Sequence, residues 1–174
     1  MSLFTVGQPV IPELATLAEE GNPGPLLGLL PTLPAVFDFT AGPGPIPPAG
    51  SMTLQVMSKP GFRRISAVGM LATTNDAFFA ISGIQVPLPP TLFFFLPFER
   101  TRILNAPAYD AGSEADSELC AFIPGPPCGN NVHDPADGEG FVHISNGIHG
   151  VGDLPADGYD WHNPVVRVKI TRMD

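Results

Sequence analysis

The stretch RISAVGMLATTNDAFFAI, residues 64–81, decides the fold class of this chain. Residues 64–73 are apolar on both faces of an extended chain, which is typical of a central strand in a two-layer structure. The polar turn TTND follows, and AFFAI at 77–81 begins another apolar run. Asp76 comes directly after the buried strand, so we expect its carboxylate at one end of the structure.

Further short strands are expected on both sides of this stretch. Residues 52–57, MTLQVM, alternate between Leu54 and Val56 on one face and polar residues on the other. The C-terminal run VVRVKITR, 165–172, alternates in the same way, with Val166, Val168 and Ile170 inward and Arg167 and Lys169 toward water. Shorter candidates are TRILNA at 101–106 and FVHI at 141–144. Short strands separated by glycine and proline turns predict a mostly β fold, an antiparallel β-sandwich.

One short helical region is expected before the strands. In IPELATLAEEG, 11–21, Pro12 suits a first helical turn and Gly21 suits a stop. Leu14, Leu17 and Ala18 form an apolar stripe at helical spacing. PLLGLL at 25–30 adds a further turn, and TAGPGPIPPAG at 40–50 predicts an irregular, stiff loop.

Composition predicts a single domain over residues 1–174 with long proline- and glycine-rich loops. The 22 prolines argue against long helices, and 44% hydrophobic residues argue for a packed core rather than disorder. A net charge of −9 with only eight Lys and Arg disfavours nucleic acid as a partner. Eleven of the seventeen acidic residues lie from Asp110 onward, and such a field attracts cations.

Neither a membrane span nor a catalytic motif is visible in the sequence. The apolar run PLPPTLFFFLPF, 87–98, is shorter than the roughly 20 residues needed to span a bilayer and is broken by prolines. The N-terminus shows no basic region followed by an apolar one, as a signal peptide would. Asp, His and Ser all occur, but nothing places them together as a hydrolytic triad, so we expect no enzyme.

Two cysteines, Cys120 and Cys128, flank the proline-rich segment AFIPGPP. In a reducing compartment they would be free thiols. In an oxidising compartment the stiff loop could hold them near bridging distance, and we expect this disulfide. A zinc site using both thiols is disfavoured, because zinc cysteines are usually spaced by about two to four residues.

An acidic turn, YDAGSEADSE at 109–118, is the best candidate site. Carboxylate oxygens are the preferred ligands of Ca²⁺, and Gly112 can supply a turn that folds Glu114 back toward Asp110. A bound divalent ion would turn the repulsion between these carboxylates into attraction. A solvated acidic turn without an ion is the alternative, and Asp116 and Glu118 are expected to remain solvated in either case.

Four motifs in this order resemble the spondin N-terminal domain family of F-spondin and mindin. They are LATTNDAFFA, PAYDAGSEADSE, GIHGVGDLPADGYDW and NPVVRVKI, and the resemblance covers roughly residues 3–170. It implies an antiparallel β-sandwich with one calcium ion at one end, held by Asp76, Asp110 and Glu114. A further acid of the family falls near Gln55 here, which departs from the pattern.

The resemblance also implies a non-catalytic adhesion or interaction module that is secreted, periplasmic or on the cell surface. Because the family's first strand has no counterpart before Leu3, we expect an exposed sheet edge and therefore a protein partner or self-association. The run at 87–98 would then be either a buried strand or part of a partner surface, and peripheral contact with a membrane or cell surface is compatible with this function.

Two other functions are kept open. The first is a copper or zinc protein that uses His143, His149 and His162, since His143 and His149 lie at the two ends of an expected turn. The second is a structural subunit of a larger assembly that needs no ion.

Overall fold

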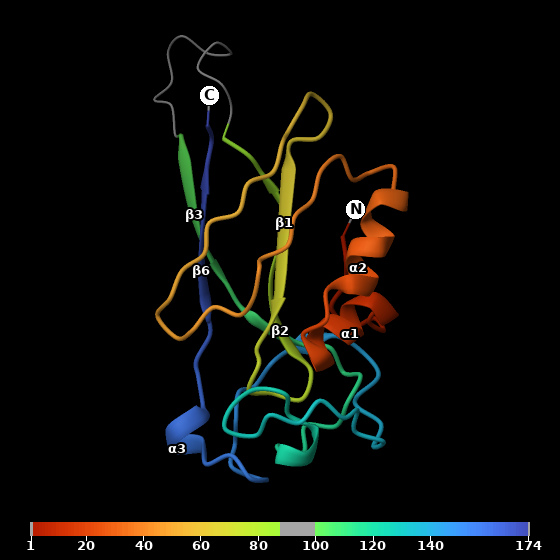
Figure 1. Cartoon of the computed structure of the whole chain (residues 1–174), viewed down its shortest axis with the longest axis vertical. Helices are drawn as coiled ribbons and strands as arrows, with labels where there is room; N and C mark the ends of the chain where they lie inside the picture. Colours follow the sequence, from red (N-terminus) through yellow and green to blue (C-terminus); the bar gives the residue numbers. More distant parts are fainter. Residues whose placement is uncertain (1, 88–99, 174) are drawn as a thin grey trace.

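The structure is a computed structural model that describes residues 2–87 and 100–173 (Figure 1). All but the first residue of the apolar run at 87–98 lies outside these ranges, and so does the prediction made for it. In chain order the elements are α1 (Pro12–Glu20), α2 (Gly24–Leu29), the 3-10 helix η1 (Leu30–Thr32), β1 (Arg64–Met70), β2 (Ala77–Gln85), β3 (Thr101–Ala106), β4 (Ala108–Asp110), the 3-10 helix η3 (Cys120–Phe122), β5 (His143–Ile144), α3 (Ala156–Tyr159) and β6 (Val166–Thr171).

The expected N-terminal helix is confirmed as α1. Pro12 occupies the first turn, where the missing N–H costs nothing, and the Gly21 N–H closes the helix on the carbonyl of Leu17. The predicted stripe of Leu14, Leu17 and Ala18 is the buried face. The expected further turn forms α2 and η1. No helix among the described residues combines the length and the apolar character needed to cross a membrane.

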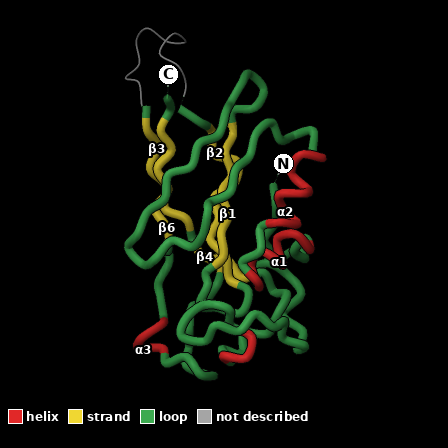
Figure 2. Tube along the Cα trace, viewed as in Figure 1, coloured by secondary structure: helices red, strands yellow, loops and turns green. Residues whose placement is uncertain are grey.

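The strands form two antiparallel sheets. One has four strands in the order β1-β2-β4-β5, and the other pairs β3 with β6. Figure 2 shows β3 and β6 side by side. The strands predicted at 64–73, 77–81, 101–106 and 165–172 are confirmed as β1, β2, β3 and β6, although β1 ends at Met70 and β2 continues to Gln85. In β6 the predicted alternation also holds, since Ile170 is buried whereas Arg167 and Lys169 are exposed.

Strand β2 lies between β1 and β4 in the four-stranded sheet, and both of its faces are covered. Phe78 and Ala80 pack with the leucines of α1 and α2 in one hydrophobic cluster. Ile81, on the opposite face, packs with Ala106 of β3 and Ile170 of β6 in a second cluster. Since successive side chains of a strand alternate between faces, the helices and the β3–β6 sheet cover opposite sides of β1 and β2, as Figure 1 shows.

The predicted strand at 52–57 is wrong. This segment has no regular structure, and Leu54 and Met57 are exposed. Its clearest anchor is the Met57 N–H, which donates to the Asp38 carboxylate at 2.6 Å. Alternation of apolar and polar residues predicts a strand only where a neighbouring strand can pair with its backbone, and no strand within residues 2–87 and 100–173 pairs with this segment. The strand expected at 141–144 shrinks to the two residues of β5.

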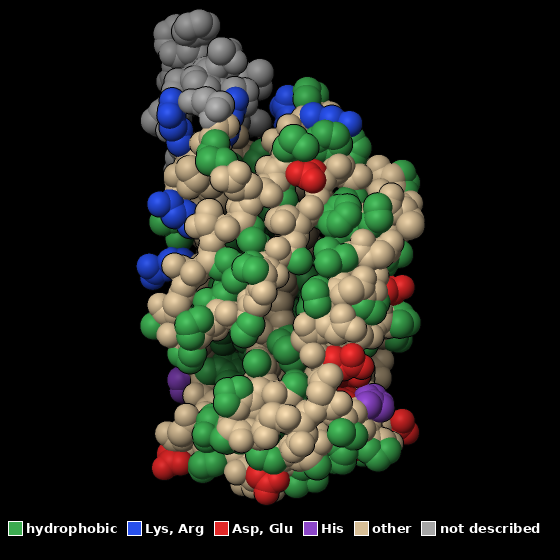
Figure 3. Space-filling model, viewed as in Figure 1, with side chains coloured by type: hydrophobic (Ala, Val, Ile, Leu, Met, Phe, Trp, Pro, Cys, Tyr) green, Lys and Arg blue, Asp and Glu red, His purple; other side chains and the backbone are tan. Residues whose placement is uncertain are grey.

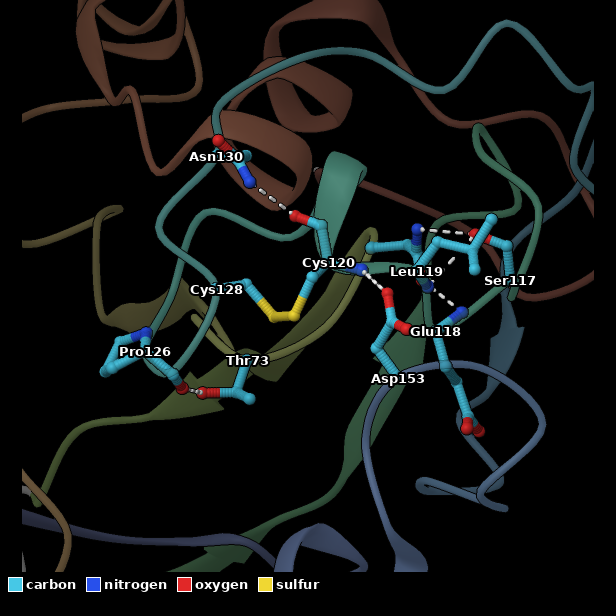
Figure 4. Close-up of a disulfide and its surroundings, with 10 residues drawn as sticks. Thr73, Ser117, Glu118, Leu119, Cys120, Pro126, Cys128, Asn130 and Asp153 are labelled. Atoms are coloured by element: carbon cyan, nitrogen blue, oxygen red, sulfur yellow. Dashed lines mark hydrogen bonds between the residues drawn. A yellow bond between two sulfur atoms is a disulfide. The ribbon is translucent and has the colours of Figure 1, made fainter.

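The disulfide between Cys120 and Cys128 is confirmed, with the two Cα atoms 4.8 Å apart (Figure 4). Both cysteines pack against a third apolar cluster of Ile123, Ile148 and Leu154. The loops that follow β4 lie below the sheets in Figure 1. Hydrogen bonds hold the bridged loop to its neighbours, from Thr73 Oγ1 to the Pro126 carbonyl and from the Cys120 N–H to Asp153. We call the loops around this cluster the loop layer. The disulfide and these hydrogen bonds hold the loop layer in place at the end of the sheet.

Candidate metal centre

Asp76 and Asp110 meet at the lower end of the four-stranded sheet. Strand pairing sets Asp110, the last residue of β4, opposite Ala77, the first residue of β2. Asp76 comes just before Ala77, in a turn that Thr74 stabilises by accepting the Ala77 N–H and donating to the Leu71 carbonyl. The carboxylate expected at the end of the structure is therefore placed there by the register between β2 and β4.

The predicted turn at DAGSE forms around Gly112. This glycine has a φ of +64° and donates its N–H to Asp110 Oδ1 at 2.7 Å. The chain then folds over Asp76, whose Oδ2 accepts the N–H groups of Ser113 at 2.7 Å and Glu114 at 3.0 Å. One oxygen of each aspartate is thus fixed by the backbone of the turn.

The other oxygen of each aspartate has no hydrogen-bond partner. Asp76 Oδ1 and Asp110 Oδ2 are both buried and unpartnered, and each residue is only 1% exposed. Folded proteins rarely leave buried polar atoms in this state, and a cation held between the two oxygens would satisfy both of them. Asp116 joins them, since one carboxylate oxygen of each of the three residues lies within 4.8 Å of the others.

Asp116 was not expected in this cluster. The sequence predicted a solvated side chain, and the residue is indeed exposed at the surface. Its carboxylate nevertheless turns toward Asp76 and Asp110. A sequence signal existed in the density of acids at 110–118, but their spacing did not show which of them would converge.

Glu114 lies in a different environment from the one predicted. Its backbone folds over Asp76, but its carboxylate forms a second cluster with Glu19 of α1 and His133. Its Oε1 accepts the Asp134 N–H at 2.8 Å and lies 2.8 Å from His133 Nδ1, while Oε2 is buried and unpartnered. No sequence signal pointed to Glu19 or His133, because both are distant in the chain from residue 114.

Glu118 is buried, so its predicted solvation is wrong. Only 4% of the residue is exposed, and its carboxylate accepts backbone N–H groups of His149 at 2.5 Å and Val151 at 2.8 Å. The loop at 149–152 wraps around this negative charge. The residue therefore holds a loop in place and has no part in the carboxylate clusters of the described residues.

Replacing Glu118 with glutamine is expected to destabilise the protein by about 1–2 kcal/mol, because hydrogen bonds to a charged acceptor are stronger than those to an amide. Urea denaturation of the variant measures this loss. Glu20, an acid of α1 that neither takes part in a carboxylate cluster nor holds this loop, supplies the matched control Glu20→Gln, which is expected to change stability little. Equal stability of both variants would show that the loop does not depend on the Glu118 charge.

Burial and mutual repulsion disfavour the ionised carboxylates. Burial, together with the charges of Asp76 and Asp116, raises the pKa of Asp110 to about 9. Burial raises the pKa of Asp76 to about 6 and that of Glu114 to about 7, although backbone donors lower both. A divalent cation at the centre would reverse this penalty.

The stability of the ion-free protein is therefore expected to fall as pH rises. These carboxyl groups bind protons more tightly in the folded state than in the unfolded state, where the aspartates titrate near 3.8. The stabilisation that comes from this tighter proton binding is fully present below about pH 4 and is lost as pH rises from about 4 to about 9. Melting temperatures measured across this range in chelator should decline, and saturating calcium should flatten the decline. A melting temperature that rises with pH in chelator would contradict the arrangement.

The structure does not gather the three histidines of the alternative metal site. His143 lies with Asp110 and Glu139. Neither His149 nor His162 belongs to any cluster of three metal-ligating side chains within residues 2–87 and 100–173, and both are exposed. The turn expected between His143 and His149 is instead organised by Glu118 and by Asp160, which accepts the Ile148 N–H.

Comparison with known proteins adds no relative. The chain matches no family model, and no curated protein is significantly similar to it. The assignment of this centre therefore depends on its residues and their geometry.

Proposed function

We propose that this protein is a calcium-binding, non-catalytic interaction module with a spondin-type β-sandwich. The observation that carries the proposal is the pair Asp76 and Asp110. Each carboxylate is buried, fixed through one oxygen by the backbone, and left with a second oxygen that has no partner. Two such oxygens beside a third carboxylate are a ready set of donors for a hard cation.

The donor type favours calcium over softer metals for this position. Calcium takes six to eight oxygen ligands in irregular geometry, and carboxylates and backbone carbonyls suit it. Asp76, Asp110 and Asp116 offer only oxygen. Glu114 remains a predicted ligand, since its Oε2 is unpartnered and the charge of Asp76 is close enough to raise the pKa of Glu114.

The resemblance to the spondin family supports the same site. The TND turn and the DAGSE turn are separated by more than thirty residues in the chain, and strand pairing brings them together at one end of the sheet. The apolar cluster shared by β2, β3 and β6 supports the packing of two sheets that a sandwich requires.

The remaining parts of the proposal concern location and partners. The disulfide supports an oxidising compartment, and we propose a secreted, periplasmic or cell-surface protein. Its role is adhesion or assembly through a protein partner or a second copy.

Calorimetric titration of chelator-treated protein with Ca²⁺ tests the function. We expect one ion to bind to the wild type and Asp76→Asn to abolish binding. Asp157→Asn, at the exposed first turn of α3, is the matched control and should bind as the wild type does. Absence of calcium binding at millimolar concentration by folded wild-type protein would refute the proposal.

A further inference from the structure

His143 faces the metal centre from the neighbouring strand. It is the first residue of β5 and pairs directly with Asp110 of β4, so the two side chains share a face of the sheet. Its Nε2 lies 3.6 Å from Asp110 Oδ1 and 3.6 Å from Glu139 Oε2. The sequence predicted neither this pairing nor a role for Glu139.

In its neutral form the ring of His143 presents a lone pair to both carboxylates. Its Nδ1 lies 3.0 Å from the carbonyl oxygen of Ile144, which can only accept a hydrogen bond, so Nδ1 carries the proton of the neutral ring. Nε2 is then an acceptor, and it is buried with no hydrogen-bond partner. Asp110, 1% exposed, adds a second unpartnered acceptor in Oδ2. An unpartnered imidazole nitrogen and two carboxyl groups are thus gathered at one point.

We propose that His143, Glu139 and Asp110 bind a second divalent ion of the zinc class, next to the calcium position and sharing Asp110 with it. An imidazole nitrogen suits zinc and similar metals and is foreign to calcium sites, which use oxygen. Two donors about 2.1 Å from a tetrahedral zinc ion lie about 3.4 Å apart, close to both observed nitrogen–oxygen separations. An open coordination position remains for water or a ligand.

Charge balance supports two ions at this end of the molecule. Asp76, Asp110, Asp116 and Glu139 place four carboxylates in two overlapping clusters. The eight Lys and Arg residues all belong to residues 59–64, 100–102 and 167–172, and those visible in Figure 3 lie in its upper half, above the loop layer. Two divalent cations would supply four positive charges, the number needed to neutralise the four carboxylates.

The second ion shares Asp110 with the calcium position, but His143 and Glu139 are not among the proposed calcium ligands, so the two proposals can be tested separately. Titration with Zn²⁺ in saturating Ca²⁺ tests it. We expect one zinc ion to bind to the wild type. Losing only an outer-shell partner of a metal site weakens metal binding by about 10–100-fold. His143 and Glu139 are proposed as direct ligands, so His143→Ala and Glu139→Gln should each weaken zinc binding by more than this. Glu139 is 38% exposed at its side chain, so its variant should fold even if the histidine variant does not.

Two controls separate this site from its neighbours. His162→Ala changes an exposed histidine outside the clusters and should leave zinc affinity unchanged. His133→Ala removes the histidine of the Glu19–Glu114 cluster and should also leave it unchanged. Loss of zinc in His133→Ala, or unchanged affinity in both His143→Ala and Glu139→Gln, would overturn the proposal.

Failure of the calcium proposal and failure of the zinc proposal give different results. Asp76→Asn should lose calcium and keep zinc, whereas Glu139→Gln should keep calcium and lose zinc. If zinc only displaces calcium, with one ion bound in total, the two positions are one site and the second ion is refuted. Zinc binding without any calcium binding would refute the calcium function and leave the second ion standing.

Discussion

Gly112→Ala is expected to destabilise the protein by about 2–5 kcal/mol. The left-handed conformation of Gly112, with φ of +64°, costs an alanine about 1–2 kcal/mol. A Cβ atom would in addition overlap the carbonyl oxygen and the nitrogen of Phe141, which are backbone atoms and cannot rotate away. Overpacking of this kind costs about 1–3 kcal/mol. Calcium affinity should fall as well, because the same turn fixes Asp110 and Asp76.

Gly140→Ala separates the two causes. Gly140 has a comparable φ of +79°, but a Cβ atom there would meet nothing within 4 Å. Its variant should therefore lose only the conformational part, about 1–2 kcal/mol, and keep calcium affinity. Chemical denaturation of both variants, with and without calcium, measures the difference. Equal losses from the two glycines would mean that the turn is not packed against Phe141.

Asp110→Asn is expected to remove the calcium-dependent part of the stability and little else. An ion bound only by the folded state stabilises it by about 2.7 kcal/mol at a hundredfold excess over Kd. In chelator near pH 7 the substitution should be almost neutral, because the raised pKa of Asp110, about 9, already keeps its carboxyl group protonated. Wild type and variant should thus unfold alike in chelator and differ in calcium.

Two further variants test the assignment of Asp110. Asp157→Asn should retain the full calcium increment. Asp116→Asn should lose a smaller part of it than Asp110→Asn, since Asp116 is exposed and water can replace its oxygen. A full calcium increment in Asp110→Asn would remove this residue from the ligand set.

Local sequence patterns were enough to predict several elements. The stripe of Leu14, Leu17 and Ala18 predicted α1, and the alternation in 165–172 predicted β6, because each pattern matches the period of the structure that buries it. The same reasoning failed for 52–57, where the alternation is present but none of the described strands pairs with the segment. Pairing is a non-local event, so the pattern alone could not decide it.

The sequence by itself determined the excess of negative charge, and it was enough to predict the tight turn at Gly112, Asp76 directly after a buried strand, and the bridge between Cys120 and Cys128. These depend on residue type and short spacing. Only the tertiary structure decided where each acid points. Strand register sets His143 against Asp110, α1 brings Glu19 to Glu114, and the loop at 149–152 buries Glu118. The physical reason is that a carboxylate's role depends on which donors, cations or other charges lie within a few ångströms, and the fold brings those groups from distant parts of the chain.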